Sequence, residues 1–241
     1  MIQLDLFETP EPAARTAKNM ADFYLPGISS LPPQLSMLYE LSVNAFYAAI
    51  HAGMSELPIE KEISRFIEKV LRAGLKTKDG QLTDDRDAAE RAASDRGNPD
   101  VLIVLNTAGR VRHEIHRITG FLRFSPATDG VYTARCSPDY FILPALAEHF
   151  TLRFGETSWA IIDEKRKLCL YRKAGGRVML SGTETARDTV AGLREEKDCK
   201  DFWENLWRLY HRSINNESRK NPGLQRKFMP ERYQKYLTEL K

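Results

Sequence analysis

Two histidines and a glutamate form the most compact group of chemically versatile side chains in the sequence. His113 and His116 flank Glu114 and lie three residues apart, a spacing that places two imidazoles on one face of a helix. Such a pair can bind zinc, but structural zinc sites use four ligands and the sequence places no third one here. We therefore expect a polar helix surface or a phosphate contact, with neither a metal nor another cofactor.

Two arginines stand directly before aromatic residues. Arg123 precedes Phe124, and Arg153 precedes Phe154. A planar guanidinium can stack on a base, bind a phosphate through two hydrogen bonds, or pair with a buried carboxylate such as Asp163. We expect one of the two arginines to form a salt bridge and the other to contact DNA, and the sequence does not decide which.

Basic residues are concentrated in the second half of the chain. The formal net charge is only +3, but residues 201–241 hold nine Lys and Arg against five Asp and Glu, and residues 120–177 hold nine against six. This half forms either a phosphate-facing surface or ordinary solvated charge. In the tail, basic residues alternate with aromatic ones, which suits nucleic-acid backbone and exposed bases. The candidate DNA contacts are Arg123, Arg153, Arg166, Arg219, Arg226, Lys227, Arg232 and Tyr233.

Other patterns favour structural roles. Trp203, Trp207 and Tyr210 form a helical stripe, which we expect in the core because large aromatic residues dominate cores. Asp163 and Arg166 fit a tight turn between strands, since aspartate accepts hydrogen bonds from nearby backbone groups.

An enzyme remains the alternative. It would be a DNA-processing hydrolase, or an enzyme associated with a glycosylase, with a pocket built from His116, Arg123, Arg153 and Asp163. The sequence contains no phosphate-binding glycine loop and no nucleophile elbow, so its catalytic residues are unknown. The three cysteines are too widely spaced for a zinc site or for an iron–sulfur cluster held by close cysteines.

The periodicity predicts an α+β fold. Residues 1–33 are expected to form a flexible lead, because six prolines and glycines interrupt regular structure there. Residues 34–119 are expected to form a helical region. Residues 120–241 read as a core domain, with an antiparallel sheet, one packed helix and a helical tail. The expected strands are 120–124, 131–136, 159–163, 167–172 and 177–180, and a helix is expected to begin at Pro138. Thr83 is expected to cap one earlier helix, Asn98 followed by Pro99 is expected to begin another, and a last helix is expected over 230–240. No apolar run is long enough to span a bilayer and no signal region opens the chain, so we expect a cytoplasmic protein.

The first residues contain a short recognition pattern. Gln3, Leu4, Asp5, Leu6 and Phe7 resemble the motif with which bacterial polymerases and repair proteins bind the replication sliding clamp. In that mode an extended peptide places its glutamine in a polar pocket and its last two residues in an apolar groove. The alternating apolar residues would also fit a short first strand. We favour clamp binding.

Three segments of the second half together resemble one family. They are Gly120–Phe124, then Pro138 to Phe154, then Arg219 to Tyr233, with Trp159, Asp163 and Arg166 between them. This combination is similar to the domain of unknown function 4130 family of bacterial proteins assigned to DNA metabolism or repair. The resemblance covers about Arg112 to Leu240, and the helical half before it also fits.

The resemblance implies a working context rather than a reaction. Relatives act beside a radical S-adenosylmethionine protein thought to modify or repair DNA, and some are fused to a domain like uracil-DNA glycosylase. We therefore expect a DNA repair accessory that binds DNA and partner proteins. A pure adaptor for the radical enzyme, with no DNA contact, is a further alternative.

Overall fold

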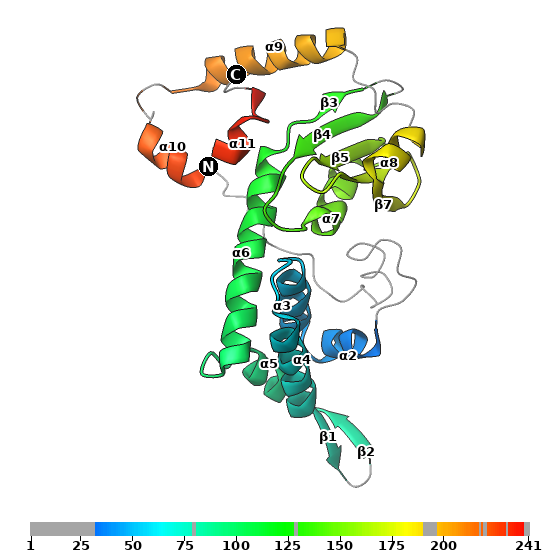
Figure 1. The fold of residues 1–241 in the computed structure, drawn as a ribbon, viewed down its shortest axis with the longest axis vertical. Helices are drawn as coiled ribbons and strands as arrows, with labels where there is room; N and C mark the ends of the chain where they lie inside the picture. Colours follow the sequence, from blue (N-terminus) through cyan, green and yellow to red (C-terminus); the bar gives the residue numbers. More distant parts are fainter. Residues whose placement is uncertain are drawn as a thin grey trace.

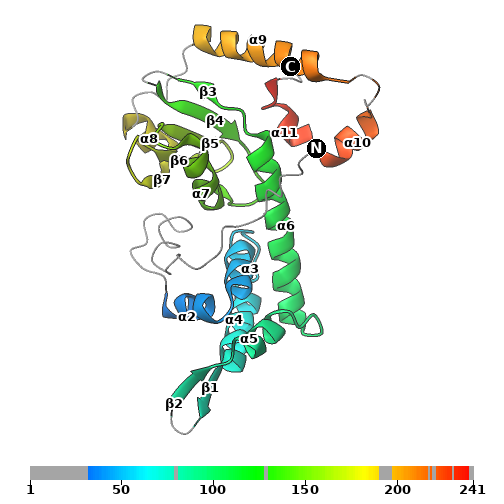
Figure 2. The same ribbon diagram turned by 180° about the vertical axis from the view of Figure 1, so that it is seen from behind.

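A single long helix runs between the two packed parts of the molecule. Helix α6 (Pro99–Phe121) links a helical part to a part built on a sheet, and both views show it as the spine (Figures 1 and 2). The computed structural model describes residues 32–78, 81–127, 130–189, 197–216, 218, 221–229 and 231–238. The clamp motif and nearly all of the N-terminal lead therefore lie outside the described residues.

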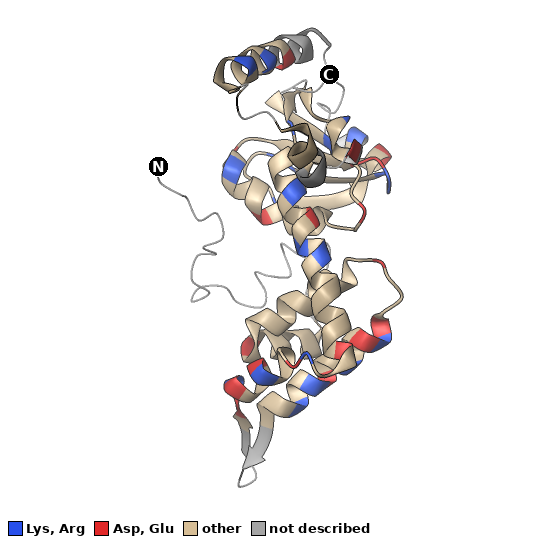
Figure 3. Cartoon of the chain, turned by 90° about the vertical axis from the view of Figure 1, so that its left-hand side faces the viewer, with Lys and Arg blue, Asp and Glu red and all other residues tan. Residues whose placement is uncertain are grey.

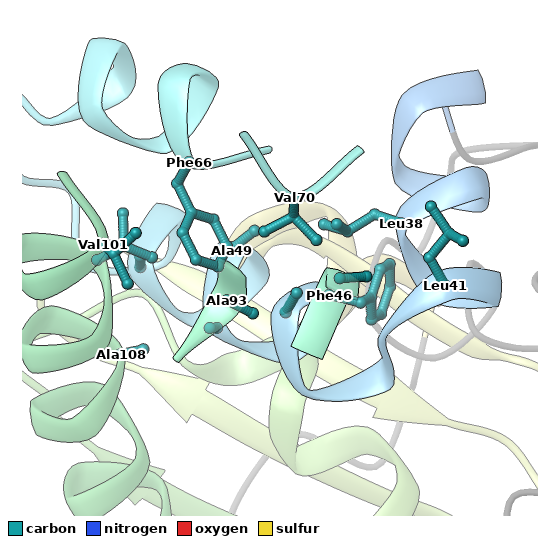
Figure 4. Close-up of a cluster of buried hydrophobic side chains, with 14 of the residues drawn as sticks. Leu38, Leu41, Phe46, Ala49, Phe66, Val70, Ala93, Val101 and Ala108 are labelled. Carbon is teal, nitrogen blue, oxygen red and sulfur yellow. The ribbon is translucent and has the colours of Figure 1, made fainter. Parts of the chain in front are cut away.

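The helical part packs short helices around the first half of α6. Its core brings together Phe46, Phe66 and Val70 with Val101 and Ala108 of α6 (Figure 4). Alanines are frequent in this core, which allows the helices to approach closely. A two-stranded hairpin extends from its far end (Figure 1). The elements are α2 (Pro33–Leu41), α3 (Val43–Gly53), α4 (Glu60–Gly74), β1 (Leu75–Lys78), β2 (Gln81–Asp84) and α5 (Arg86–Ala93).

Side-chain caps mark where α5 and α6 begin. Asn98 accepts hydrogen bonds from the backbone N–H groups of Asp100 and Val101, and Pro99 occupies the first turn, as the sequence predicts. Asp85, rather than the expected Thr83, caps α5 by accepting from the N–H of Ala88.

The second part is a five-stranded sheet covered on both faces. Its strand order is β3-β4-β5-β6-β7. Because side chains alternate along a strand, Trp159 and Ile161 of the central strand pack against α6 and α7, while Ala160 and Ile162 pack toward α8. The elements are β3 (Ser125–Pro126), β4 (Tyr132–Cys136), α7 (Leu143–Phe154), β5 (Trp159–Asp163), β6 (Leu168–Arg172), β7 (Val178–Gly182) and α8 (Thr183–Thr189).

The α+β class is confirmed, but the sheet is mixed rather than antiparallel. Strands β4 and β5 run parallel, with Tyr132 opposite Trp159, whereas the other pairs are antiparallel. The reason is that α7 connects β4 to β5, and a crossover helix returns the chain in the same direction.

Two predicted boundaries also differ. The strand expected over 120–124 is wrong, because α6 continues to Phe121 and buries Ile118 against the sheet, and the strand that follows, β3, comprises only Ser125–Pro126. The helix expected from Pro138 begins only at Leu143. Residues before it stay non-helical because their N–H groups bond elsewhere: Phe141 donates to the carbonyl oxygen of Met54 at 2.9 Å, which ties this loop to the helical part.

Three further helices are described after α8. They are α9 (Lys197–Ile214), α10 (Pro222–Phe228) and α11 (Glu231–Gln234). In Figure 1, α9 lies above the sheet, whereas α10 and α11 lie on the other side of α6 from the sheet. The last helix is much shorter than the 230–240 expected. Among the described residues, no helix is long and apolar enough to cross a membrane.

The helical part buries one titratable imidazole. His51 on α3 is only 7% exposed, and its Nδ1 has no hydrogen-bond partner among the described residues. Burial, assisted by the positive charge of Arg112, lowers the pKa of His51 to about 4. At neutral pH the imidazole is therefore uncharged.

This burial predicts a pH-dependent loss of stability. In the unfolded chain His51 takes up a proton near its ordinary pKa of 6.5, whereas the folded protein resists protonation down to about 4. Between these values the unfolded state binds more protons, so stability falls as the pH falls. We expect the free energy of unfolding to drop by about 2 kcal/mol more in the wild type than in His51→Phe between about pH 7.5 and about pH 5. Urea denaturation of both proteins measures this difference, and parallel pH profiles would contradict it.

Candidate nucleic-acid interface

A cleft lined by arginines and aromatic rings lies between α9 and the near edge of the sheet part. Its volume is about 670 Å³. One wall comes from β3, β4, the end of α7 and the segment after α6, and the other comes from α9. The aromatic and arginine residues that line it are Arg123, Phe124, Tyr132, Arg153, Phe154, Trp207 and Tyr210.

Each wall carries its own group of rings. On the sheet side, Phe154 contacts Phe124 edge to face with ring centroids 4.7 Å apart, and it contacts Tyr132 at 5.6 Å. On α9, Trp207 and Tyr210 lie 5.7 Å apart. These α9 rings are 37% and 52% exposed. Both walls can therefore offer flat apolar faces to a ligand.

Arg123 connects the two walls. Its guanidinium lies over the indole of Trp207, 5.3 Å from the ring centroid, and it donates to the carbonyl oxygens of Gly120 and Leu122 at 2.9 and 3.3 Å. These acceptor oxygens lie at the carboxyl end of α6, where the negative end of the helix dipole favours a cation. Arg123 is thus held in place while still lining the cleft.

The charge balance in the cleft is positive. Arg153 is exposed at the end of α7 and lines the cleft together with Arg123. Glu204 also lines it, but Arg208 one turn further along α9 donates to the Glu204 carboxylate at 3.2 Å. Stacking faces beside guanidiniums are the arrangement with which proteins bind single-stranded nucleic acid.

The structure corrects the expected role of the tryptophan stripe. Trp207 and Tyr210 were expected in the core, yet they are exposed and line the cleft. The sequence signal that favours this outcome is the polar remainder of α9, since a helix with only one apolar face can leave that face uncovered. The side chain of Trp203 lies outside the described residues.

The structure also shows which arginine pairs with Asp163. Asp163 is fully buried, and its carboxylate accepts from Arg166 at 2.9 Å rather than from Arg123 or Arg153. It further accepts from the backbone N–H groups of Lys165 and Arg166, which is the tight turn predicted. The pairing is local because the turn places Arg166 three residues after Asp163.

Arg166 is engaged on several sides by the protein itself. Its guanidinium donates to the carbonyl oxygens of Pro138 and Asp139 and to the carboxylate of Glu56, beyond the end of α3. The hydrogen bond from Arg166 lowers the pKa of Glu56. This cluster joins the helical part to the turn between β5 and β6, so we assign Arg166 a structural role.

Tyr233 is a core residue rather than an exposed contact. It is 1% exposed, its ring packs 5.6 Å from that of Phe121, and its hydroxyl donates to Glu114 Oε1 at 2.7 Å. Glu114 is also buried, and it accepts from the backbone N–H groups of Asp139 and Tyr140, both at 2.8 Å. The ring of Tyr233 is therefore not available for stacking on a base.

The remaining candidates fall into two groups. His113 and His116 are exposed on α6, and no group of three or more metal-binding side chains occurs in the described part of the chain. The cleft lining includes neither His116 nor Asp163, so the four-residue hydrolase pocket is not assembled there. The side chains of four basic candidates lie outside the described residues: Arg219, Arg226, Lys227 and Arg232.

The buried Glu114 contact predicts an unequal effect of two similar tyrosine substitutions. Tyr233→Phe removes a donor from a buried carboxylate, so we expect it to lower the free energy of unfolding by about 1–3 kcal/mol. The matched control is Tyr236→Phe. The Tyr236 hydroxyl donates to Glu164, which is exposed and can exchange that donor for water, so a loss below about 1 kcal/mol is expected. Equal losses in chemical denaturation would show that burial of Glu114 is not decisive.

Comparison with known proteins agrees with the sequence resemblance. No curated protein and no solved structure matches the chain. The sequence model of the family described as Domain of unknown function (DUF4130) matches residues 67–239, which is most of the chain. The match includes most of α4, all of α6, the sheet and the C-terminal helices. The chain therefore belongs to the DUF4130 family.

Proposed function

We propose that this protein is a cytoplasmic bacterial accessory of DNA repair or DNA metabolism that binds DNA and holds partner proteins there. The observation that carries the DNA proposal is the arginine–aromatic cleft. Its two walls can hold unpaired bases between rings while Arg123 and Arg153 neutralise phosphates. The proposal does not rest on overall charge, because basic and acidic residues are interleaved on the side seen in Figure 3.

Exposed apolar side chains on two C-terminal helices support the partner part of the proposal. Along α9, Leu209 is 66% exposed and Ile214 is 59% exposed, and Leu224 on α10 is 52% exposed. A partner that covered these side chains would remove apolar surface from water, which favours association. The family resemblance suggests a radical S-adenosylmethionine protein as the partner, which would supply any radical chemistry.

We expect salt-dependent DNA binding that depends on Trp207. Stacking on one base contributes about 1–3 kcal/mol, so Trp207→Ala should weaken binding to a single-stranded oligonucleotide about tenfold or more. Arg123→Ala should weaken it as well and reduce the salt dependence. Charge reversal at Arg226 and Lys227 should lower the salt slope further. Fluorescence anisotropy with labelled single-stranded and duplex DNA, over a series of salt concentrations, measures these effects.

The chain offers matched controls for the Trp207 and Arg123 substitutions. Leu209→Ala changes an exposed apolar residue of the same helix, and Arg177→Ala removes an exposed arginine, yet neither residue lines the cleft. Both variants should bind DNA like the wild type. Absence of salt-dependent binding to any DNA would refute the proposal. If Trp207→Ala and Leu209→Ala lose the same amount of DNA affinity, the cleft is not the DNA-binding site.

We also propose that the N-terminal motif delivers the protein to the sliding clamp. Support comes from the five matching residues, Gln3 to Phe7, and from the prolines at 10 and 12, which favour an extended peptide. A labelled peptide of residues 1–14 should bind purified clamp with micromolar affinity. Binding should disappear in Gln3→Ala and in the double variant Leu6→Ala with Phe7→Ala. If neither the peptide nor the full chain binds the clamp, the motif has another role.

A further inference from the structure

A second pocket lies between the helical part and α7. It has a volume of about 560 Å³, within the range of small-molecule sites. Helices α3, α5, α6 and α7 all contribute to it, together with the segment that follows α5. It shares no lining residue with the arginine–aromatic cleft, so the two are separate sites.

The pocket combines small apolar side chains with aromatic rings. Four alanines from three helices line it, and their short side chains would allow a planar group to lie against them. The rings of Tyr47 and His51 line the same pocket and are stacked, with centroids 5.9 Å apart and planes inclined by 26°. The alanines are Ala45, Ala48, Ala93 and Ala108.

The imidazole of His51 is a buried polar group of the pocket lining. His51 lines the pocket at 7% exposure, and its Nδ1 has no hydrogen-bond partner among the described residues. A buried polar atom without a partner is unfavourable. Because Nδ1 has almost no accessible surface, a ligand reaches it only when the ring turns toward the pocket, and a ligand that then supplies a partner gains affinity. Since the imidazole is uncharged at neutral pH, it offers a hydrogen-bonding edge like that of a heterocyclic base.

Charged residues of both signs surround the opening. Arg96 and Arg112 come from different elements and can bind a phosphate through paired hydrogen bonds. Glu90 and Glu148 also line the pocket, and Glu90 already accepts from Ser42 and Asn44. Carboxylates disfavour a ligand that is only anionic, but they accept from hydroxyl and amino groups. The lining therefore favours a ligand that carries a planar ring, hydroxyl or amino donors, and one anionic group.

A mononucleotide has all three features. We propose that this pocket binds a nucleoside monophosphate, with its base against the four alanines beside Tyr47 and His51 and its phosphate at Arg96 and Arg112. Two sources share this chemistry: a free nucleotide and the 5′-phosphorylated terminal nucleotide of a DNA strand. The site is independent of DNA binding in the arginine–aromatic cleft.

Isothermal titration of the full chain with the purine and pyrimidine nucleoside monophosphates tests the proposal. At least one of them should bind at sub-millimolar concentration, and more tightly than either its nucleoside or inorganic phosphate. Arg112→Ala should weaken that binding about tenfold or more. Arg110→Ala is the matched control, because Arg110 is exposed on the same helix and does not line the pocket. Absence of binding by every nucleotide, or equal binding by the two arginine variants, would overturn the proposal.

Two further variants separate the contribution of the imidazole from that of the arginine–aromatic cleft. His51→Phe keeps an aromatic ring but removes both ring nitrogens, so it should weaken nucleotide binding severalfold. If His51→Phe fails to fold, Arg112→Ala still tests the site, because Arg112 is exposed. Trp207→Ala should leave nucleotide binding unchanged even though it impairs DNA binding. In that background, displacement of the nucleotide by a 5′-phosphorylated oligonucleotide assigns the pocket to a strand end. Lack of displacement assigns it to a free nucleotide, and either result supports the site.

Discussion

The buried carboxylate of Glu114 is the contact on which the arrangement of the second half depends. It accepts the backbone N–H groups of Asp139 and Tyr140 and the hydroxyl of Tyr233. Three segments far apart in sequence thereby meet at one side chain of α6. A buried carboxylate needs such donors, because the loss of even one leaves an acceptor unsatisfied in a medium of low dielectric constant. The helix, the loop before α7 and the C-terminal segment are therefore positioned together.

A second polar cluster lies next to this contact and joins the two parts of the molecule. Arg166 bonds to Asp163, to the loop carbonyls of Pro138 and Asp139, and to Glu56 beyond α3. The N–H of Phe141 adds a backbone bond to Met54. Much of the sequence pattern that resembles the family, including Pro138, Asp163, Arg166 and Tyr233, is thus used to hold the structure together. Removing one partner of a buried ion pair leaves the other charge buried without compensation. The loss of stability is therefore larger than the net contribution of the intact pair, which makes these residue types difficult to exchange.

The two candidate sites lie on either side of this rigid centre. The arginine–aromatic cleft forms where α9 crosses the edge of the sheet part, and its Arg123 is oriented by the carboxyl end of α6. The pocket around His51 forms where α3 and α5 meet the first half of α6. Helix α6 contributes to both cores, through Val104 on one side and Ile118 on the other. The spine therefore fixes both sites relative to one another without any residue belonging to both.

The sequence alone was enough to predict the local features of the chain. It predicted the cap at Asn98 with Pro99, the three strands after Trp159 and the turn at Asp163, because each depends on neighbours within a few residues. It also determined the family. Tertiary structure decides which aromatic residues are buried. Tyr233 enters the core because Glu114, 119 positions away, accepts its hydroxyl, while Trp207 lies in the cleft wall, 37% exposed, with the guanidinium of Arg123 over its ring. The parallel pairing of β4 and β5 and the continuation of α6 past the expected boundary have the same origin. Burial against distant segments outweighs the local preference of a segment for helix or strand. The periodicity of one segment does not indicate which distant segment will cover it.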